Sequence, residues 1–198
     1  MRLVECEQRS EAWFQARCGV PTASNFDKIV TSKGEPSKQR EKYLYQLAGE
    51  FVTGVPTETY QNANMIRGNE LEAEAREYYS FVKEVEVQTI GFCLEDGGKF
   101  GASPDALIGD KGLAQFKCPL ISTHVGYLLE NKLPTDYVQQ TQGELLVTGR
   151  EYNDFVSYYP GLKLFVVRVE RDEVFLKKLE MELRVFCEEL REVVEKIR

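Results

Sequence analysis

Apolar side chains recur at intervals of three and four residues along much of the chain, the spacing that places them on one face of an α-helix. This pattern predicts the helices Ser10–Gln15, Asn25–Val30, Glu41–Thr53, Asn69–Lys83, Thr123–Glu130, Asp136–Leu146 and Leu179–Ile197. Ser10 begins the first of these helices and Ser24 precedes the second, and both have side chains suited to N-caps. The apolar positions of the last helix alternate in steps of four and three, which favours packing on a sheet over a subunit contact.

Segments rich in β-branched and aromatic residues, bounded by turn residues, predict the strands. They are Val85–Leu94, Phe100–Ile108, Leu113–Lys117, Asn153–Tyr158, Leu162–Val169 and, as a further candidate, Glu173–Lys178. Helices come first, a mixed sheet follows and a helix closes the chain, so we expect an α/β or α+β fold. No repeat or linker rich in Pro, Gly or Ser interrupts residues 1–198, which predicts a single domain.

The composition is that of a globular protein, with 42% hydrophobic and 29% charged residues. No apolar run approaches the roughly 20 residues that span a bilayer, and the N-terminus has no apolar signal region. We therefore expect a cytoplasmic protein without a membrane partner. The five cysteines are scattered and form no CxxC pair, which argues against a disulfide framework and against a zinc or iron–sulfur site. The net charge of −7 excludes a wholly basic nucleic-acid-binding surface but not a local basic channel.

The segment 101–119 carries the clearest candidate chemistry. Asp105 begins a predicted strand, a turn follows at 109–112, and the next strand carries Gln115 and Lys117. Residues two apart on a strand face the same side, so a carboxylate, a carboxamide and an ammonium should meet in one small volume. Divalent cations held by carboxylates activate water and neutralise charge in phosphodiester hydrolysis, and a lysine beside them can orient the attacking water. The pattern predicts a metal-dependent nuclease core in which Gln115 stands where a second carboxylate is expected.

Motifs along nearly the whole chain add a family resemblance. They are Ser103–Ala106 (SPDA), Gln115–Pro119 (QFKCP), Trp13–Ser24 (WFQARCGVPTAS), Arg67–Arg76 (RGNELEAEAR), Gln140–Gln142 (QTQ) and Val167–Asp172. In this order they resemble the phage lambda exonuclease family, also called the YqaJ-type viral recombinases, within the PD-(D/E)xK nuclease superfamily. The resemblance implies a restriction-endonuclease-like mixed central sheet flanked by helices.

The resemblance also implies roles for individual residues. Glu72, Asp105, Gln115 and the backbone carbonyl of Phe116 would hold metal, with Lys117 positioning the attacking water. A pocket for a terminal 5′ phosphate would be formed by Arg17, Ser24, Ser103 and Gln140, with Gln142 in a supporting role. An arginine fork with hydroxyl and amide donors suits a phosphate dianion.

Several of these residues have a simpler interpretation when the sequence is taken alone. Glu72 reads as a solvated helix glutamate, Asp105 as a turn residue, Lys117 as an edge-strand lysine and Ser24 as a plain N-cap. Tyr137 is expected to pack rather than to contact DNA. His124, the single histidine, follows the core motif but has no evident carboxylate or serine partner in the sequence.

The implied activity is a Mg²⁺-dependent 5′-to-3′ exonuclease. It would use two ions, with Mn²⁺ as an alternative, and would degrade one strand of duplex DNA from a 5′-phosphorylated end to leave a 3′ single-stranded tail. Members of the family act in phage recombination with a single-strand annealing protein and form ring-shaped homotrimers. The cationic residues between Lys28 and Lys42 are candidates to line the channel of such a ring. The alternative is that they belong to a solvated loop.

Gln115 departs from the family, where glutamate is expected. An amide oxygen can coordinate Mg²⁺ but brings no charge, so the substitution should weaken metal affinity and impair this copy. It is explained either by an engineered change that traps uncut DNA or by a natural variant in which Glu72 and Asp105 suffice; the intact surrounding motifs favour the first. Two other functions stay open, namely a catalytically decayed DNA-end-binding protein and an endonuclease of the same superfamily.

Overall fold

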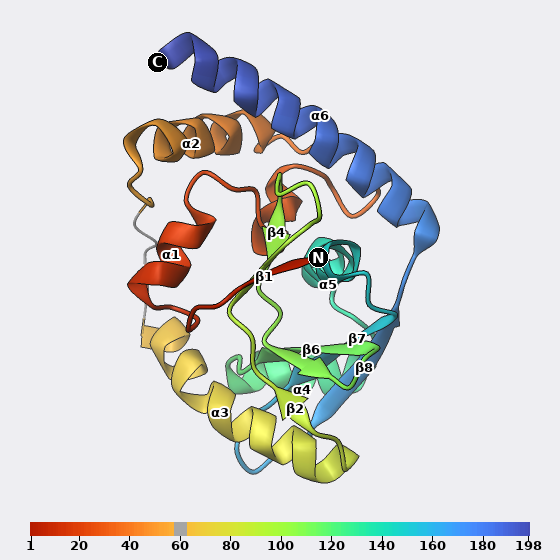
Figure 1. Ribbon diagram of the computed structural model, residues 1–198. Helices are drawn as coiled ribbons and strands as arrows, with labels where there is room; N and C mark the ends of the chain where they lie inside the picture. The colour runs from red at the N-terminus through yellow and green to blue at the C-terminus, as the bar shows by residue number, and fades with distance from the viewer. Residues whose placement is uncertain (58–62) are drawn as a thin grey trace.

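A five-stranded mixed sheet forms the centre of the computed structural model, which describes residues 1–57 and 63–198 (Figure 1). Its strand order is β2-β5-β6-β7-β8. The strands are β2 (Val87–Gln88), β5 (Ala106–Ile108), β6 (Gly112–Lys117), β7 (Tyr152–Ser157) and β8 (Phe165–Glu170). Only the β6–β7 pair is parallel among these neighbours, and the α-helical connection between the two strands explains that direction.

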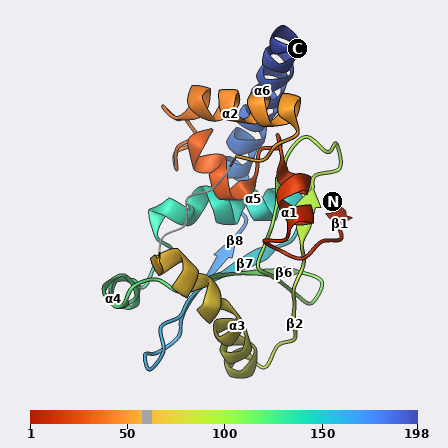
Figure 2. The same ribbon diagram turned by 90° about the vertical axis from the view of Figure 1, so that its left-hand side faces the viewer.

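Helices cover both faces of this sheet. Helix α3 (Ala63–Lys83) packs its buried Ala75 and Tyr79 on the face that carries Phe116. Helices α4 (Ile121–Glu130) and α5 (Val138–Thr148), separated by the short 3-10 helix η2 (Thr135–Tyr137), lie on the opposite face (Figures 1 and 2). The mixed sheet flanked by helices confirms the predicted fold class.

A second layer covers α5 on the side away from the sheet. It contains α1 (Glu11–Arg17), the 3-10 helix η1 (Ala23–Lys28), α2 (Arg40–Thr53) and α6 (Glu173–Ile197), with the small sheet β1-β3-β4 beside them (Figure 2). The small strands are β1 (Arg2–Val4), β3 (Phe92–Leu94) and β4 (Gly101–Ala102). In the described part of the chain, no helix is long and apolar enough to cross a membrane.

Most predicted elements are present with shifted ends. Ser10 is the N-cap of α1, since its hydroxyl accepts from the Trp13 amide at 3.2 Å. Ser24 is not an N-cap: it lies inside η1, which is preceded by Thr22. Helix α3 begins six residues before the predicted Asn69.

Two predicted strands were wrong in their continuity. The stretch 85–94 divides into β2 and β3, and 100–108 divides into β4 and β5. In each case one half joins the small sheet and the other half joins the large one. The chain passes from one sheet to the other here, and Asp105 lies at this crossing immediately before β5.

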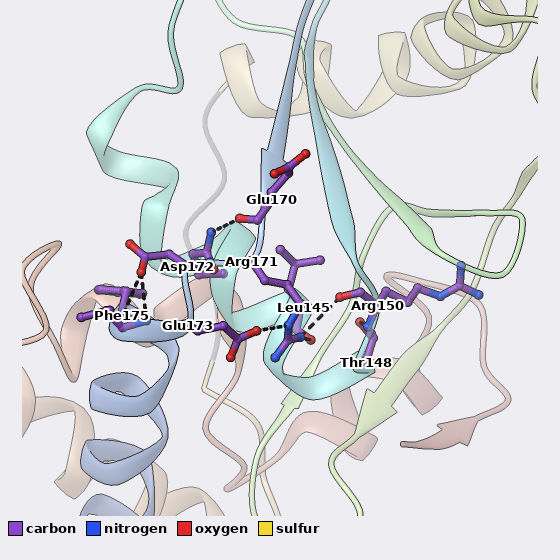
Figure 3. Close-up of polar contacts among 10 residues, drawn as sticks. Leu145, Thr148, Arg150, Glu170, Arg171, Asp172, Glu173 and Phe175 are labelled. Carbon is purple, nitrogen blue, oxygen red and sulfur yellow. Dashed lines mark hydrogen bonds and ion pairs between the residues drawn. The ribbon is translucent and has the colours of Figure 1, made fainter.

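The candidate strand Glu173–Lys178 was also wrong, because it forms the first turns of α6. The Asp172 side chain accepts from the Val174 and Phe175 amides at 3.1 and 3.0 Å, which starts the helix at this point (Figure 3). Arg171 donates to the Leu145 carbonyl at 2.9 Å and so ties this junction to the end of α5.

Candidate active site

Asp105 and Gln115 meet as the strand spacing predicts. Asp105 Oδ2 accepts from Gln115 Nε2 at 2.5 Å and from the Phe116 amide at 2.7 Å, and both side chains are buried. Asp105 immediately precedes β5, and Gln115 lies on β6. These strands pair antiparallel across the tight turn at 109–111, which brings Asp105 beside Gln115. The Gln115 carboxamide therefore supplies one of the two hydrogen bonds that Asp105 Oδ2 accepts.

The other half of the Gln115 side chain is unsatisfied. Its Oε1 is buried and has no hydrogen-bond partner among the described residues. A buried carbonyl oxygen without a partner costs free energy, and a hard cation is one group that can satisfy it. The donor set of Asp105, Glu72 and this oxygen fits a divalent cation in chemistry. Across residues 1–57 and 63–198 no group of three or more His, Cys, Asp or Glu side chains is placed to bind metal.

Neighbouring charges shift the pKa of Asp105 in opposite directions. Burial raises the pKa of Asp105, the neighbouring Glu72 carboxylate raises that pKa further, and Lys117 lowers it. Lys117 shares a face of β6 with Gln115, and its Nζ lies 5.3 Å from the centre of the Tyr137 ring. Because Lys117 lowers the pKa of Asp105, its ammonium lies close enough to interact electrostatically with that carboxylate.

Glu72 lies on α3 and forms an ion pair with Arg9. Its side chain is 13% exposed, which contradicts the alternative of a solvated helix glutamate. Arg9 is a residue that the sequence interpretation missed. It has a left-handed backbone (φ 68°) just before α1, and no motif marked it.

A second cluster surrounds Arg17. Its guanidinium donates to Ser103 Oγ and Ser24 Oγ, each at 3.1 Å, and lies 4.0 Å over the Trp13 ring. Burial lowers the pKa of Arg17 to about 10, so the group stays cationic at neutral pH. Trp13 Nε1 also donates to Ser103 Oγ, at 2.9 Å. Three of the four predicted phosphate-binding residues are therefore joined by direct contacts.

An open cavity of about 590 Å³ adjoins this cluster. Arg9, Trp13, Arg17, Ser24 and Lys28 are among the residues that line it. Trp13 and Thr22, whose hydroxyl accepts from Arg17 at 3.3 Å, were not predicted as site residues. Both belong to the WFQARCGVPTAS motif, which is the signal that could have indicated them.

Gln140 and Gln142 lie in different surroundings. Gln140 is one turn before Glu144 on α5 and donates to Glu144 Oε1 at 2.9 Å. Gln142 uses both ends of its amide on the β8–α6 junction, donating to the Glu170 carbonyl at 2.7 Å and accepting from the Asp172 amide at 3.0 Å. These contacts suit Gln142 to support rather than to bind substrate.

Glu144 is a second buried carboxyl beside the site. It is 1% exposed, and its Oε2 accepts from Asn153 Nδ2 at 2.7 Å. Burial, with the nearby Asp105 carboxylate as the next cause, raises the pKa of Glu144 to about 8. The sequence interpretation missed it, since a helix glutamate four residues after a glutamine gives no sign of burial.

His124 and Tyr137 are held by hydrogen bonds and ring packing within the protein. His124 is fully buried, with Nδ1 2.8 Å from Ser157 Oγ and Nε2 3.1 Å from the Lys163 carbonyl. The Nε2–H donates to that carbonyl, which leaves Nδ1 to accept from the serine and ties α4 to β7. The Tyr137 ring packs 4.8 Å from that of Phe155.

Solved structures of other proteins share this fold. A crystal structure of an alkaline exonuclease from Laribacter hongkongensis superposes with a TM-score of 0.87 at 35% identity, covering 95% of this chain and 96% of that one. A structure of the same enzyme in complex with dAMP gives 0.86 at 36% identity over 95% and 96%. A phage-related exonuclease from Haemophilus somnus shares the fold, with a TM-score of 0.73 at 14% identity over 90% and 96%.

Sequence comparison gives a more distant relative and a family. An uncharacterized protein, R354, of Acanthamoeba polyphaga mimivirus is 27% identical over 174 residues, or 79% of this chain, and the match spans 30% of that longer protein. The model of the YqaJ-like viral recombinase domain matches residues 12–151, a range that includes Arg17, Glu72, Asp105, Gln115 and Gln140. This chain belongs to the YqaJ-like viral recombinase domain family.

Proposed function

We propose that this protein is a metal-dependent 5′-to-3′ exonuclease that degrades one strand of duplex DNA from a 5′-phosphorylated end and leaves a 3′ single-stranded tail. One observation carries the proposal. Ser103, which Arg17 contacts at 3.1 Å, is only two residues before Asp105. One short segment therefore carries both a contact of the Arg17 cluster, which suits a terminal phosphate, and a buried carboxylate that suits a metal.

The Arg17 cluster supports recognition of the DNA end. A phosphate monoester presents several acceptor oxygens, and Arg17, Ser24 and Ser103 offer a guanidinium fork with two hydroxyl donors. The cavity beside them is open, so a DNA end can enter. An endonuclease would have no use for such a cluster, which favours an enzyme that starts at ends.

The carboxylate cluster supports hydrolysis. Glu72, Asp105, Gln115 Oε1 and the Phe116 carbonyl would hold divalent cations, with two Mg²⁺ ions in the active form and Mn²⁺ as a substitute. Bound there, the ions would lower the pKa of water and offset the charge that develops on the phosphate. Lys117 would orient the attacking water, because its ammonium lies on the same face of β6 as Gln115.

Gln115 weakens this chemistry in the present chain. A carboxamide removes one negative charge from the metal site, and its N–H occupies Asp105 Oδ2 at 2.5 Å. The same contact favours a second candidate function, a DNA-end-binding protein that has lost catalysis, because it satisfies Asp105 without a metal. We place the exonuclease first because Glu72, Asp105 and Lys117 are retained.

The wider setting is also proposed from the family. A ring of three copies in the cytoplasm, acting with a single-strand annealing protein, would reconcile the net charge of −7 with DNA binding if cationic groups line the ring. Lys28 lies at the cavity and is a candidate for this lining. Arg40 is not, because it pairs with Glu189 of α6.

The polarity of degradation tests the proposal. Linear duplexes labelled at the 5′ or the 3′ end, and a closed circular duplex, are incubated with the Gln115→Glu chain and Mg²⁺. We expect early release of the 5′ label, retention of the 3′ label and an intact circle. Early release of the 3′ label refutes the polarity, and cutting of the circle indicates an endonuclease.

A further inference from the structure

Gln140, which is half-buried, and Glu144, which is buried, form a hydrogen-bonded pair whose purpose the preceding chemistry leaves open. They lie one helical turn apart on α5, and Gln140 Nε2 donates to Glu144 Oε1 at 2.9 Å. Glu144 uses its other oxygen to accept from Asn153 Nδ2 at 2.7 Å. A carboxyl that is 1% exposed is costly to bury unless its oxygens are hydrogen-bonded, as both oxygens of Glu144 are.

Helix α5, which carries the pair, packs against η1 and against β7. Gly143 lets α5 approach η1 closely, since a Cβ there would be 2.5 Å from a Phe26 ring atom. Ser24 belongs to η1, so this contact brings α5 beside the proposed phosphate cluster. Asn153 lies on the same face of the large sheet as Gln115 and Lys117, as the β6–β7 register shows. Glu144 thus connects α5, which packs against the element that carries Ser24, to β7, which pairs with the strand that carries Gln115 and Lys117.

The chemistry of an amide explains what this connection can do. A glutamine side chain can present either an N–H or a carbonyl oxygen to a neighbour, and a phosphate accepts only the N–H. An acceptor beside Gln140 selects the orientation in which Nε2 faces it. One Nε2 hydrogen then goes to Glu144 and the second stays available to a phosphate oxygen.

We propose that Glu144 is a positioning residue that fixes the Gln140 carboxamide in its phosphate-donating orientation and is itself anchored by Asn153. The inference rests on the proposed recognition of a 5′ phosphate. It assigns to Glu144 no contact with substrate, metal or the reacting atoms. Because Oε1 keeps a lone pair for Gln140 whether or not the carboxyl is protonated, the role does not depend on its charge.

The arrangement predicts which substitutions are tolerated. In Glu144→Gln the new side chain still offers an oxygen to Gln140. Its amide nitrogen then faces Asn153, whose Oδ1 is buried and unpaired among the described residues and can accept once that amide turns over. Glu144→Met keeps the length of the side chain and removes the acceptor.

The test is equilibrium binding of short duplexes that carry a 5′ phosphate or a 5′ hydroxyl, at fixed salt and without metal, so that cleavage does not interfere. The readout is the dissociation constant of the 5′-hydroxyl duplex divided by that of the 5′-phosphorylated duplex. We expect Glu144→Met to lower this ratio about tenfold, the lower end of the range for one hydrogen bond to a charged group. We expect Glu144→Gln to keep the ratio of the parent chain, and Glu144→Met to have no further effect in a Gln140→Ala chain.

Asp154→Asn is the matched control. Asp154 is buried next to Asn153 but on the opposite face, where it accepts from Tyr79 and Arg168. Its substitution should lower stability and leave the ratio unchanged, which separates loss of orientation from general loosening of β7.

The outcomes separate the inference from the function on which it rests. A parent chain with no preference for the phosphate refutes end recognition and the inference together. A parent preference that Glu144→Met retains, or that it loses additively with Gln140→Ala, refutes the inference alone. If Glu144→Met does not fold, side-chain amide NMR of the parent decides: one slowly exchanging Gln140 Nε2 proton supports the role, and two rapidly exchanging protons refute it.

Discussion

Replacing Arg17 by lysine keeps a positive charge in the proposed phosphate cluster but removes the planar fork that contacts Ser24 and Ser103. A lysine ammonium offers a point charge and cannot reproduce two parallel N–H donors at these positions. Each hydrogen bond to a charged group is worth roughly 1.5–3 kcal/mol. Loss of one bond to a bound phosphate should therefore weaken binding of a 5′-phosphorylated end by about 10- to 100-fold.

The assay is a binding titration of 5′-phosphorylated and 5′-hydroxyl duplexes at one salt concentration, because backbone contacts depend steeply on salt. Arg168→Lys is the matched control. The Arg168 guanidinium also makes a two-pronged contact, with Asp154, and lies 3.7 Å over the Tyr152 ring. The substitution Arg168→Lys should leave the preference for a 5′-phosphorylated duplex unchanged. The reasoning is refuted if Arg17→Lys binds both duplexes with the discrimination of the parent chain.

Three further predictions concern stability and pH. Gly143→Ala should destabilise the fold by about 1–3 kcal/mol in denaturant unfolding, because its Cβ would be 2.5 Å from the Phe26 ring; an unchanged midpoint contradicts the close approach of α5 and η1. Asp172→Ala should cost about 1 kcal/mol by removing the cap of α6, whereas an exposed control, Glu173→Ala, should cost less. The pKa of Glu144 is raised to about 8 in the folded state, so the folded protein binds a proton more tightly than the unfolded chain. Stability should therefore fall as pH rises from about 4.5 to 8, and Glu144→Gln should flatten that fall in pH-dependent unfolding; an identical slope in both chains contradicts a buried Glu144.

The centre of the candidate site followed from short-range rules. Asp105, Gln115 and Lys117 are brought together by a tight turn between two strands, and both the turn and the strand alternation are visible in the sequence. The N-cap Ser10 was predictable for the same reason, because a cap accepts hydrogen bonds from backbone amides only a few residues away.

Long-range packing determined what the sequence did not indicate. The stretches 85–94 and 100–108 have continuous strand character, yet each divides between two sheets because their partners lie elsewhere in the chain. The segment Glu173–Lys178 has a strand-like composition, and the Asp172 cap and the packing of Phe175 and Leu176 make it helical. Glu144 looks like a solvated helix residue until β7 covers it.

The activity of the Gln115→Glu chain tests the central claim most directly. Duplexes with a 5′ phosphate are incubated with Mg²⁺ and either the parent chain or this variant, and single-turnover rates of nucleotide release are compared. Restoring the carboxylate should raise the rate by at least about a hundredfold, the upper range for disturbing groups that merely support metal ligands. We expect this gain together with slower release from 5′-hydroxyl ends. A Gln115→Glu chain that folds, binds Mg²⁺ and still releases no nucleotide would contradict it.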